Sequence, residues 1–220
     1  MICIQRYMDA LLALLRQTFG DALLYVGLQG SYLRGEAHEN SDIDIMVILE
    51  TVDLPALDRY RAVLETVGDT DKSCGFLCSR EDMAHWNPTE IPHLLRCTKD
   101  YYGNLTDFVP PYTTYDLKVF LQTALGNLYH ELVHRYIHRP PERSLEALAE
   151  LHRSVFFILQ NLLLYRDGVY PETRAVLAEI LTGEERKIWE MLCRCRENDC
   201  GTAEDLSQLL AWCAKTMHTL

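Results

Sequence analysis

Hydrophobic positions in the first half of the chain change between the spacing of strands and that of helices. Nearly continuous apolar runs rich in Leu, Ile and Val predict strands inside a sheet, and they lie at residues 22–29, 42–49 and, more weakly, 73–79. Apolar residues three or four positions apart predict helices, and they lie at residues 4–18, 32–37, 55–67 and 81–86. We therefore predict a small mixed β-sheet with helices packed on it.

The second half of the chain has helical spacing almost throughout. Prolines and glycines divide it into four long stretches, at residues 113–138, 142–167, 171–197 with a break near Gly183, and 202–219. Short connections between helices of similar length predict an up-and-down bundle. Residues 87–111 contain four prolines and Gly103, which predicts strand fragments and loops. The expected fold is α+β, with a sheet domain at 1–111 and an all-helical bundle domain at 112–220.

Composition and charge restrict the function classes. The 220 residues include 32 acidic and 21 basic side chains, a formal net charge of -11. This charge argues against general nucleic-acid binding, because phosphates require a surplus of Lys and Arg. No apolar run reaches the roughly 18 residues of a membrane span, and the first residues lack the pattern of a signal peptide. We therefore expect a cytoplasmic protein, whose eight cysteines are free thiols.

Residues 30–47 contain the candidate chemistry. A predicted strand leads into Gly30-Ser31, and a helix follows directly. Backbone N–H groups at such a helix start bind phosphate, because they have no partner within the helix. Glycine permits close approach of the backbone, and the hydroxyl of Ser31 adds a donor. The turn is therefore a candidate phosphate site.

Asp42 and Asp44 are a candidate metal site, eleven residues or more after Ser31. Residues two apart in a strand share a face, so both carboxylates are expected to point the same way. That arrangement is costly unless a cation neutralises it, and Mg²⁺ binds one or two carboxylates together with substrate phosphates. The combination indicates metal-assisted phosphoryl or nucleotidyl transfer. The alternative is a tight turn followed by an edge strand with two solvated aspartates.

The segment resembles the signature of the DNA polymerase beta-like nucleotidyltransferases, through Gly30-Ser31, Arg34-Gly35, Ala37 and Ser41-Asp42-Ile43-Asp44. It is similar above all to the small bacterial kanamycin-type and minimal nucleotidyltransferases. The resemblance implies that Asp42 and Asp44 hold Mg²⁺ and that Gly30 and Ser31 contact the triphosphate of an NTP, expected to be ATP. It also implies that Arg34 assists at the phosphates, and that the helical bundle forms the second wall of the cleft.

The sequence departs from this family at one position. The family usually carries a third carboxylate on the next strand, which completes the metal site and often activates the acceptor hydroxyl, but residues 73–79 contain no acid. Three explanations of the missing acid stay open. The base comes from the helical domain, or two carboxylates suffice for a different acceptor, or the domain binds nucleotide without turnover. Asp71, just before this strand, could replace the third carboxylate if a shift in strand register brought it near the site. The resemblance to kanamycin-type enzymes implies Glu131, on the first long helix, as general base.

Two zinc patterns compete with this interpretation. His130-Glu131-Leu132-Val133-His134 matches H-E-x-x-H, in which two histidines one turn apart share a zinc ion, with Glu146 or Glu150 as the third ligand. A solvated helix surface is the simpler interpretation. Cysteines 193, 195 and 200, with Cys213 or His218, form a second candidate cluster, against which half-buried thiols are the simpler interpretation.

An aromatic patch is a further candidate for the nucleotide cleft. Tyr101-Tyr102-Gly103 lies near Arg96 and Lys99, and aromatic rings stack on bases while cations meet phosphates. A turn before the second domain is the alternative.

These observations lead to one hypothesis and one rival. The hypothesis is a Mg²⁺-dependent enzyme that moves a nucleoside monophosphate from an NTP to a hydroxyl of an aminoglycoside-like small molecule or of a protein, releasing pyrophosphate. The rival is a catalytically degenerate, nucleotide-binding or antitoxin-like protein that acts with a protein partner. A homodimer is compatible with both.

Overall fold

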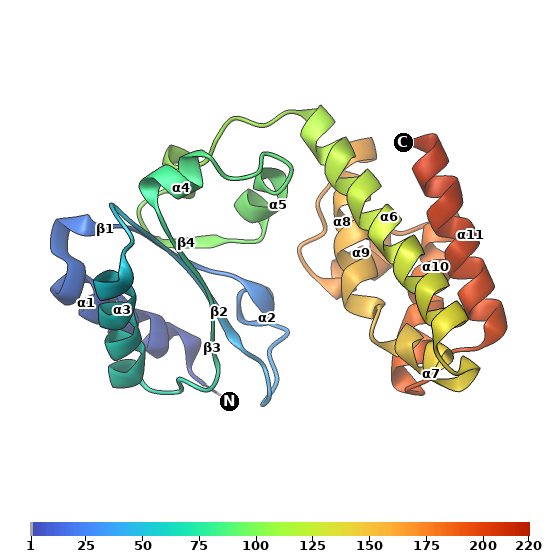
Figure 1. The fold of residues 1–220 in the computed structure, drawn as a ribbon, viewed down its shortest axis with the longest axis horizontal. Coiled ribbons are helices and arrows are strands. Elements are labelled where there is room, and N and C mark those ends of the chain that lie inside the picture. Colours follow the sequence, from blue (N-terminus) through green and yellow to red (C-terminus); the bar gives the residue numbers. More distant parts are fainter. Residues whose placement is uncertain (1) are drawn as a thin grey trace. The chain divides into compact units, whose positions relative to one another are not determined.

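The computed structural model describes residues 2–220, with residue 141 described by its backbone alone. The chain divides into two compact units, one ending at Tyr112 and the other running from Thr113 to Leu220 (Figure 1). Each unit has a hydrophobic core of its own. The boundary expected after residue 111 lies one residue before this division.

The first unit is built on a four-stranded mixed sheet with the strand order β3-β2-β1-β4. Its strands are β1 (Leu23–Leu28), β2 (Ile43–Leu49), β3 (Ser73–Ser79) and β4 (Lys99–Tyr102). Strand β1 is antiparallel to β2 and β4, and β2 is parallel to β3. The helical elements are α1 (Ile4–Phe19), η1 (Gly20–Ala22), α2 (Gly30–Arg34), α3 (Leu54–Val67), α4 (Arg80–Ala84), α5 (Ile91–Arg96) and η2 (Leu105–Asp107). The predicted small mixed sheet is confirmed.

The two faces of the sheet bury different side chains. Ile45 and Val47 of β2 pack under α1 and α3. Met46 and Ile48 point to the opposite face, because side chains alternate along a strand, and they are covered there by α4 and η2. Figure 1 shows α1 and α3 on one side of the sheet and α4 on the other. A side chain on the Met46 face therefore lies away from α1 and α3.

Three details of the first unit differ from the prediction. Helix α2 begins at Gly30 and ends at Arg34, whereas a helix was expected at 32–37. Strand β2 begins after Asp42, which was expected inside the strand. Residues 91–96 form α5, with Pro92 in its first turn, where only strand fragments and loops were expected. Proline suits a first turn because the N–H that it lacks has no partner there.

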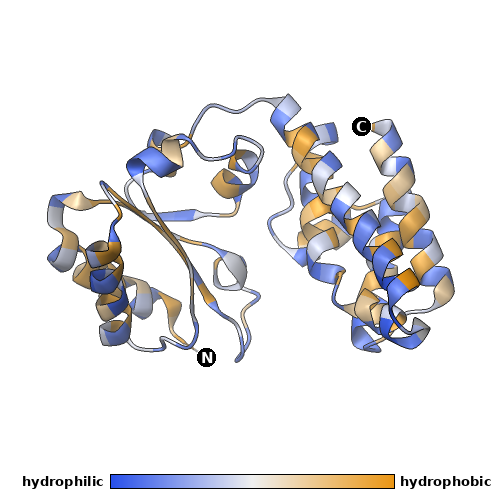
Figure 2. Cartoon of the chain, in the orientation of Figure 1, coloured by the Kyte–Doolittle hydropathy of each residue, from blue (hydrophilic) through white to orange (hydrophobic). Residues whose placement is uncertain are grey.

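The second unit is a bundle of four long helices with two short ones. Its helical elements are α6 (Thr114–His138), α7 (Pro141–Glu146), η3 (Ala147–Ala149), α8 (His152–Asp167), α9 (Arg174–Ile180), α10 (Gly183–Glu197) and α11 (Ala203–Thr219). Helix α6 packs on α8 and α11, and α10 packs on the same two helices. Figure 2 shows hydrophobic and hydrophilic residues alternating along these helices, which buries one stripe of each in the bundle core. The predicted helical domain is confirmed.

Two of the predicted long helices are broken in the structure. The stretch 142–167 turns at η3, where the backbone N–H of Gly201 donates to the carbonyl of Leu145 at 3.0 Å. The stretch 171–197 breaks at Leu181, which is extended, and the next helix begins at Gly183, where a break was expected. A single helix over 142–167 was wrong, since tertiary hydrogen bonds and caps decide where a helical pattern stops.

No single helix within residues 2–220 has both the length and the apolar content needed to cross a membrane. The bent pair Glu142–Ala149 and His152–Asp167 reaches both criteria when the two segments are taken together.

Candidate active site

Four residues lie next to one another across one end of the sheet, in the order Cys74, Asp44, Gln29 and Thr98. Asp44 of β2 pairs in register with Cys74 of β3. On its other side, the backbone N–H of Gln29 donates to the carbonyl oxygen of Asp44 at 2.8 Å. The Gln29 side chain contacts Met46 Sδ at 3.8 Å and donates to the hydroxyl of Thr98 at 2.7 Å. Asp44 is two residues from Met46, so it shares the face that lies away from α1 and α3.

Gly30 lies directly against the carboxylate of Asp44. Its φ of +70° is in the left-handed region, which favours glycine. A Cβ atom at this position would lie 1.8 Å from Asp44 Oδ2 and 2.6 Å from Asp44 Cγ. Only glycine fits, and the two halves of the sequence motif therefore meet in space.

Asp42 and Ser31 flank this contact in the chain. Asp42 is exposed, Ile43 is fully buried and Asp44 is half-buried, the alternation that an extended backbone gives when two carboxylates share one face. Ser31 is half-buried in α2, and its carbonyl accepts the backbone N–H of Glu36 at 2.9 Å. Its hydroxyl is therefore carried by a turn whose backbone is fixed.

The carboxylates suit a hard divalent cation. Two aspartates beside a backbone that leaves no room for a Cβ match the way Mg²⁺ is bound, through one or two carboxylates and substrate oxygens. Among residues 2–220 there is no group of three or more His, Cys, Asp or Glu side chains placed to hold a metal ion. A cation at this site would take its remaining ligands from water or substrate.

The position of a third carboxylate on β3 is held by other residue types. Cys74 occupies the row of Asp44, and Phe76 lies one step further along the same face. The β2–β3 pairing runs without a shift from Ile43–Ser73 to Leu49–Ser79. Asp71 is exposed in the turn before β3, and this unbroken register excludes the shift that would bring it beside Asp44. The Asp71 alternative was wrong.

Helix α5 adds two residues that the sequence did not single out. Arg34 Nε pairs with Glu36 Oε2 at 2.9 Å, and both side chains are mostly buried. Burial, and next the nearby guanidinium of Arg34, lower the pKa of His93 to about 4. Burial raises the pKa of Cys97 to about 11, with the carboxylate of Asp44 as a weaker contribution in the same direction. Cys97 directly precedes Thr98, whose hydroxyl accepts a hydrogen bond from Gln29, so the end of α5 lies close to the candidate site. The sequence pattern gave no signal for His93 or Cys97, because Pro92 was assigned to a loop.

We expect the lowered pKa of His93 to make the first unit less stable in acid. An unfolded His binds a proton near pH 6.5 whereas the folded one does so near 4. The free energy of unfolding therefore falls as pH drops between these values and is fully retained above them. Wild type should lose about 2 kcal/mol more than a His93→Gln variant between pH 7 and 4.5 in urea unfolding. Equal losses in both proteins would contradict the placement of His93.

The aromatic patch lies on the other face of the sheet. Tyr101 and Tyr102 pack against the core under α1 and α3. The guanidinium of Arg16 lies 4.8 Å from the Tyr102 ring centre, and Lys99 Nζ lies 5.3 Å from that of Tyr101. Tyr102 pairs with Val26, which faces the same core, and the register irregularity beside this pair places the consecutive Tyr101 on that core too. The suggestion that these tyrosines line the nucleotide cleft was wrong, because this core lies on the face away from Asp44.

Glu131 lies on α6 in the second unit, within an ion pair. Its Oε1 is 2.7 Å from Arg135 Nη2. The imidazole rings of His130, His134 and His138 follow one another along the exposed side of α6, with centres 5.8 and 4.7 Å apart. No third ligand joins the two histidines of the H-E-x-x-H pattern among the described residues, so this pattern forms no zinc site there.

The cysteines near the end of the chain differ in burial and in the groups that they contact. Cys195 is buried, Cys200 is exposed, and Cys193 Sγ lies 3.5 Å from Nε2 of the buried His152. Burial raises the pKa of the Cys193 thiol. Within residues 2–220 these thiols form no metal cluster, and Cys193 is a half-buried thiol against an imidazole.

Comparison with known proteins finds similarity over part of the first unit. Residues 9–72 match the family model of the nucleotidyltransferase domain. Over 60 residues the chain is 38% identical to a protein of Methanocaldococcus jannaschii that is named as a protein adenylyltransferase. This stretch is 27% of the present chain and 41% of the relative, so less than half of the relative's length is spanned.

Solved structures extend the similarity at the level of the fold. The spectinomycin adenyltransferase AAD(9) from Enterococcus faecialis, solved with ATP and spectinomycin, matches with a TM-score of 0.59 at 14% identity, over 97% of this chain and 99% of that one. A toxin-antitoxin structure with AMP-PNP gives a TM-score of 0.34 at 21% identity, over 59% of this chain and 94% of that one. Gly30, Ser31, Asp42 and Asp44 all lie inside the segment that matches the nucleotidyltransferase domain, so residues 9–72 are similar to this domain at the positions that first suggested the resemblance.

Proposed function

We propose that the chain is a Mg²⁺-dependent nucleotidyltransferase that moves AMP from ATP to a hydroxyl group of an acceptor. The observation that carries this proposal is the contact of Gly30 with the carboxylate of Asp44. This contact joins two groups into one site. One is the backbone that we propose binds the triphosphate, and the other is the carboxylate that we propose holds the cation. ATP is favoured as the donor because the relatives are named for adenylyl transfer and one was solved with ATP.

The proposed roles follow the positions of the side chains. Asp42 and Asp44 would hold Mg²⁺, whose charge would offset that of the phosphates and orient them. The backbone of Gly30 and the hydroxyl of Ser31 would donate hydrogen bonds to phosphate oxygens. Arg34 would add a positive charge from the end of α2, with its guanidinium oriented by Glu36.

The reaction itself is a displacement at phosphorus. The acceptor hydroxyl oxygen attacks the α-phosphorus of ATP and forms a new P–O bond. The bond from that phosphorus to the oxygen bridging the α- and β-phosphates breaks, and pyrophosphate leaves. The hydroxyl proton passes to a base, for which we propose Glu131 of α6. Its ion pair with Arg135 must open before the carboxylate accepts that proton.

Two acceptor classes are supported by the names of the relatives. One relative is a spectinomycin adenyltransferase, which favours an aminoglycoside-like hydroxyl. The other is named for adenylyl transfer to protein, which favours a Ser, Thr or Tyr hydroxyl of a protein. The roles proposed for Asp42 and Asp44 are the same for both acceptor classes.

The proposal is tested by pyrophosphate release. The full chain is incubated with ATP and Mg²⁺, with either a panel of aminoglycosides and spectinomycin or a protein mixture as acceptor. We expect release that depends on one acceptor class and is lost in Asp44→Asn. Tight ATP binding with no release for any acceptor, together with a stable complex with a partner protein, would instead favour the degenerate rival, which is motivated by the absence of an acid in β3.

Adding a carboxylate at Cys74 is expected to raise turnover. Cys74 is exposed and in register with Asp44, so an aspartate there would supply a third oxygen ligand to the cation. We expect Cys74→Asp to increase the rate of pyrophosphate release about tenfold, which corresponds to ~1.4 kcal/mol in the barrier. Cys74→Ser is the matched control and should leave the rate unchanged. A rate in Cys74→Asp no higher than in the control would mean that a third carboxylate is not what limits the site.

A further inference from the structure

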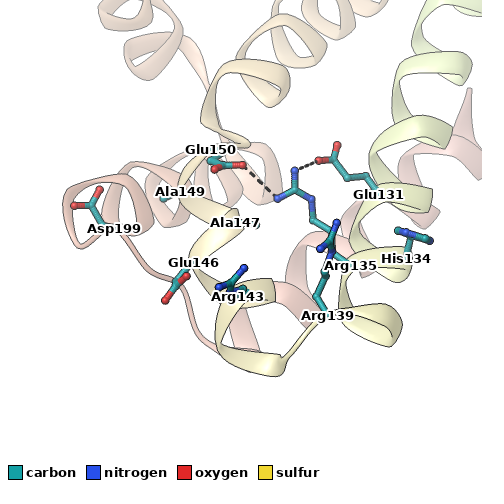
Figure 3. A pocket seen from close by; sticks show the side chains of 10 residues that line it. All are labelled: Glu131, His134, Arg135, Arg139, Arg143, Glu146, Ala147, Ala149, Glu150 and Asp199. Carbon is teal, nitrogen blue, oxygen red and sulfur yellow. Dashed lines mark hydrogen bonds and ion pairs between the residues drawn. The ribbon is translucent and has the colours of Figure 1, made fainter.

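A pocket of about 880 Å³ lies within the helical unit. Its walls come from the last turns of α6, from α7 and η3, and from the turn between α10 and α11, as Figure 3 shows (Figure 3). All of its lining residues belong to the one unit that begins at Thr113. Its volume falls in the range of small-molecule sites.

One wall of the pocket is held by an ion-pair triad. Arg135 bridges two carboxylates, with Nη2 2.7 Å from Glu131 Oε1 and Nη1 3.3 Å from Glu150 Oε2. The buried hydroxyl of Ser144 donates to the carbonyl of Arg135 at 2.9 Å, which joins α7 to α6 and satisfies a carbonyl at the end of that helix. The charge of Arg135 is therefore already neutralised, and the wall is preorganised.

Two further guanidinium groups line the same pocket without a carboxylate partner. Arg139 and Arg143 are four positions apart across the Pro140-Pro141 break, and both are exposed. Within residues 2–220 neither of them forms an ion pair, although the chain has 32 acidic residues to offer. In the view of Figure 3, Arg143 lies between Arg139 and Glu146, and Asp199 lies beyond Glu146. The lining therefore changes from arginines at Arg139 and Arg143 to carboxylates at Glu146 and Asp199.

We propose that this pocket binds a small polar molecule with a phosphate monoester at one end and hydroxyl or amino groups at the other. Arg139 and Arg143 both line this pocket, and arginine donates paired hydrogen bonds to the oxygens of a phosphate. The carboxylates of Glu146 and Asp199 accept hydrogen bonds from hydroxyl or amino groups. The proposed contacts of this ligand do not involve Asp42, Asp44 or Gly30. Glu131, proposed above as the base, lines the same pocket, but its carboxylate is paired with Arg135 and is not among the groups proposed to bind the ligand.

The test uses glucosamine 6-phosphate as the probe and the full chain in a phosphate-free buffer of low salt. Calorimetry should show saturable binding of this probe and competition by inorganic phosphate, with much weaker binding of glucosamine. The double variant Arg139→Gln, Arg143→Gln should weaken binding by about 100-fold, since two charge-assisted hydrogen-bonding groups are lost. The double variant Arg153→Gln, Arg186→Gln removes the same charge from the unit outside the pocket and should bind as wild type does.

Circular dichroism of each variant separates loss of binding from loss of fold. Since Arg139 and Arg143 are exposed, both double variants should keep the melting temperature of the wild type. Absence of binding to wild type, equal binding by the Arg139→Gln, Arg143→Gln variant, or binding of glucosamine as tight as that of its phosphate would each overturn the proposal. If the pocket variant does unfold, the single variants Arg139→Lys and Arg143→Lys decide the matter, because they keep the charge but lose the paired donors.

Discussion

Replacing Gly30 by alanine is expected to lower nucleotidyl transfer by at least about 100-fold, because displacement of a reacting or binding group by about 1 Å is enough for such a loss. The added Cβ would lie 1.8 Å from Asp44 Oδ2, so the carboxylate, the turn or both must move. The positive φ at Gly30 adds strain of about 1 kcal/mol or more. The measurement is the initial rate of pyrophosphate release with saturating ATP and Mg²⁺.

Gly35 supplies a matched control for this effect. Its φ of +69° is almost the same as that of Gly30, but a Cβ atom there meets nothing within 4 Å. Gly35→Ala therefore carries the backbone strain without the collision. We expect it to keep the rate within a few-fold of wild type. If both variants lost activity equally, strain in the turn rather than contact with Asp44 would be the cause, and the account of the site would be wrong.

The largest effect on stability is expected from Gly75→Ala. Gly75 of β3 has φ +128°, and a Cβ atom there would lie 1.9 Å from the backbone carbonyl oxygen of Ile45 in β2. Backbone atoms of a paired strand cannot move aside as a flexible side chain can, so β2 and β3 must separate locally. We expect a loss of about 3 kcal/mol or more in the free energy of unfolding. Urea unfolding gives this value, and faster hydrogen exchange at residues 43–49 locates the damage.

Gly68→Ala is the control for Gly75→Ala. Gly68 follows α3 with φ +94°, and a Cβ atom added there would meet nothing within 4 Å. Its replacement should cost only the strain of this positive-φ conformation, about 1 to 2 kcal/mol. A loss for Gly75→Ala no greater than for Gly68→Ala would contradict the close β2–β3 approach.

The parts of the site that depend on local spacing could be predicted from the sequence. The strand pattern and the two-residue spacing of Asp42 and Asp44 were enough to expect carboxylates on one face, since side-chain direction in a strand follows from its period of two. The Gly-Ser turn was expected to bind phosphate for its backbone. Its contact with Asp44 was not expected, because that contact depends on how β1 and β2 pair.

Other parts could not be predicted because long-range pairing decides them. The β2–β3 register excluded Asp71 and put Cys74 beside Asp44, and register depends on tertiary packing as well as on the strand's own pattern. Helix α5 was not predicted because the prolines in this segment give it the composition of a loop. His93 and Cys97 were missed for the same reason. Tyr101 and Tyr102 were only candidates for the nucleotide cleft, because neither the face nor the partner of a strand as short as β4 could be predicted from the sequence.

Calorimetric titration of ATP with and without Mg²⁺ tests most directly whether Asp42 and Asp44 form a Mg²⁺-dependent ATP site. Wild type is compared with the double variant Asp42→Asn, Asp44→Asn, and Asp71→Asn serves as a control that removes an exposed acid from the turn before β3. The account predicts that wild type and Asp71→Asn bind ATP at least about tenfold more tightly with Mg²⁺, and that the double variant loses this dependence. A wild type that binds none of the NTPs, or a double variant that keeps the full Mg²⁺ dependence, would contradict it.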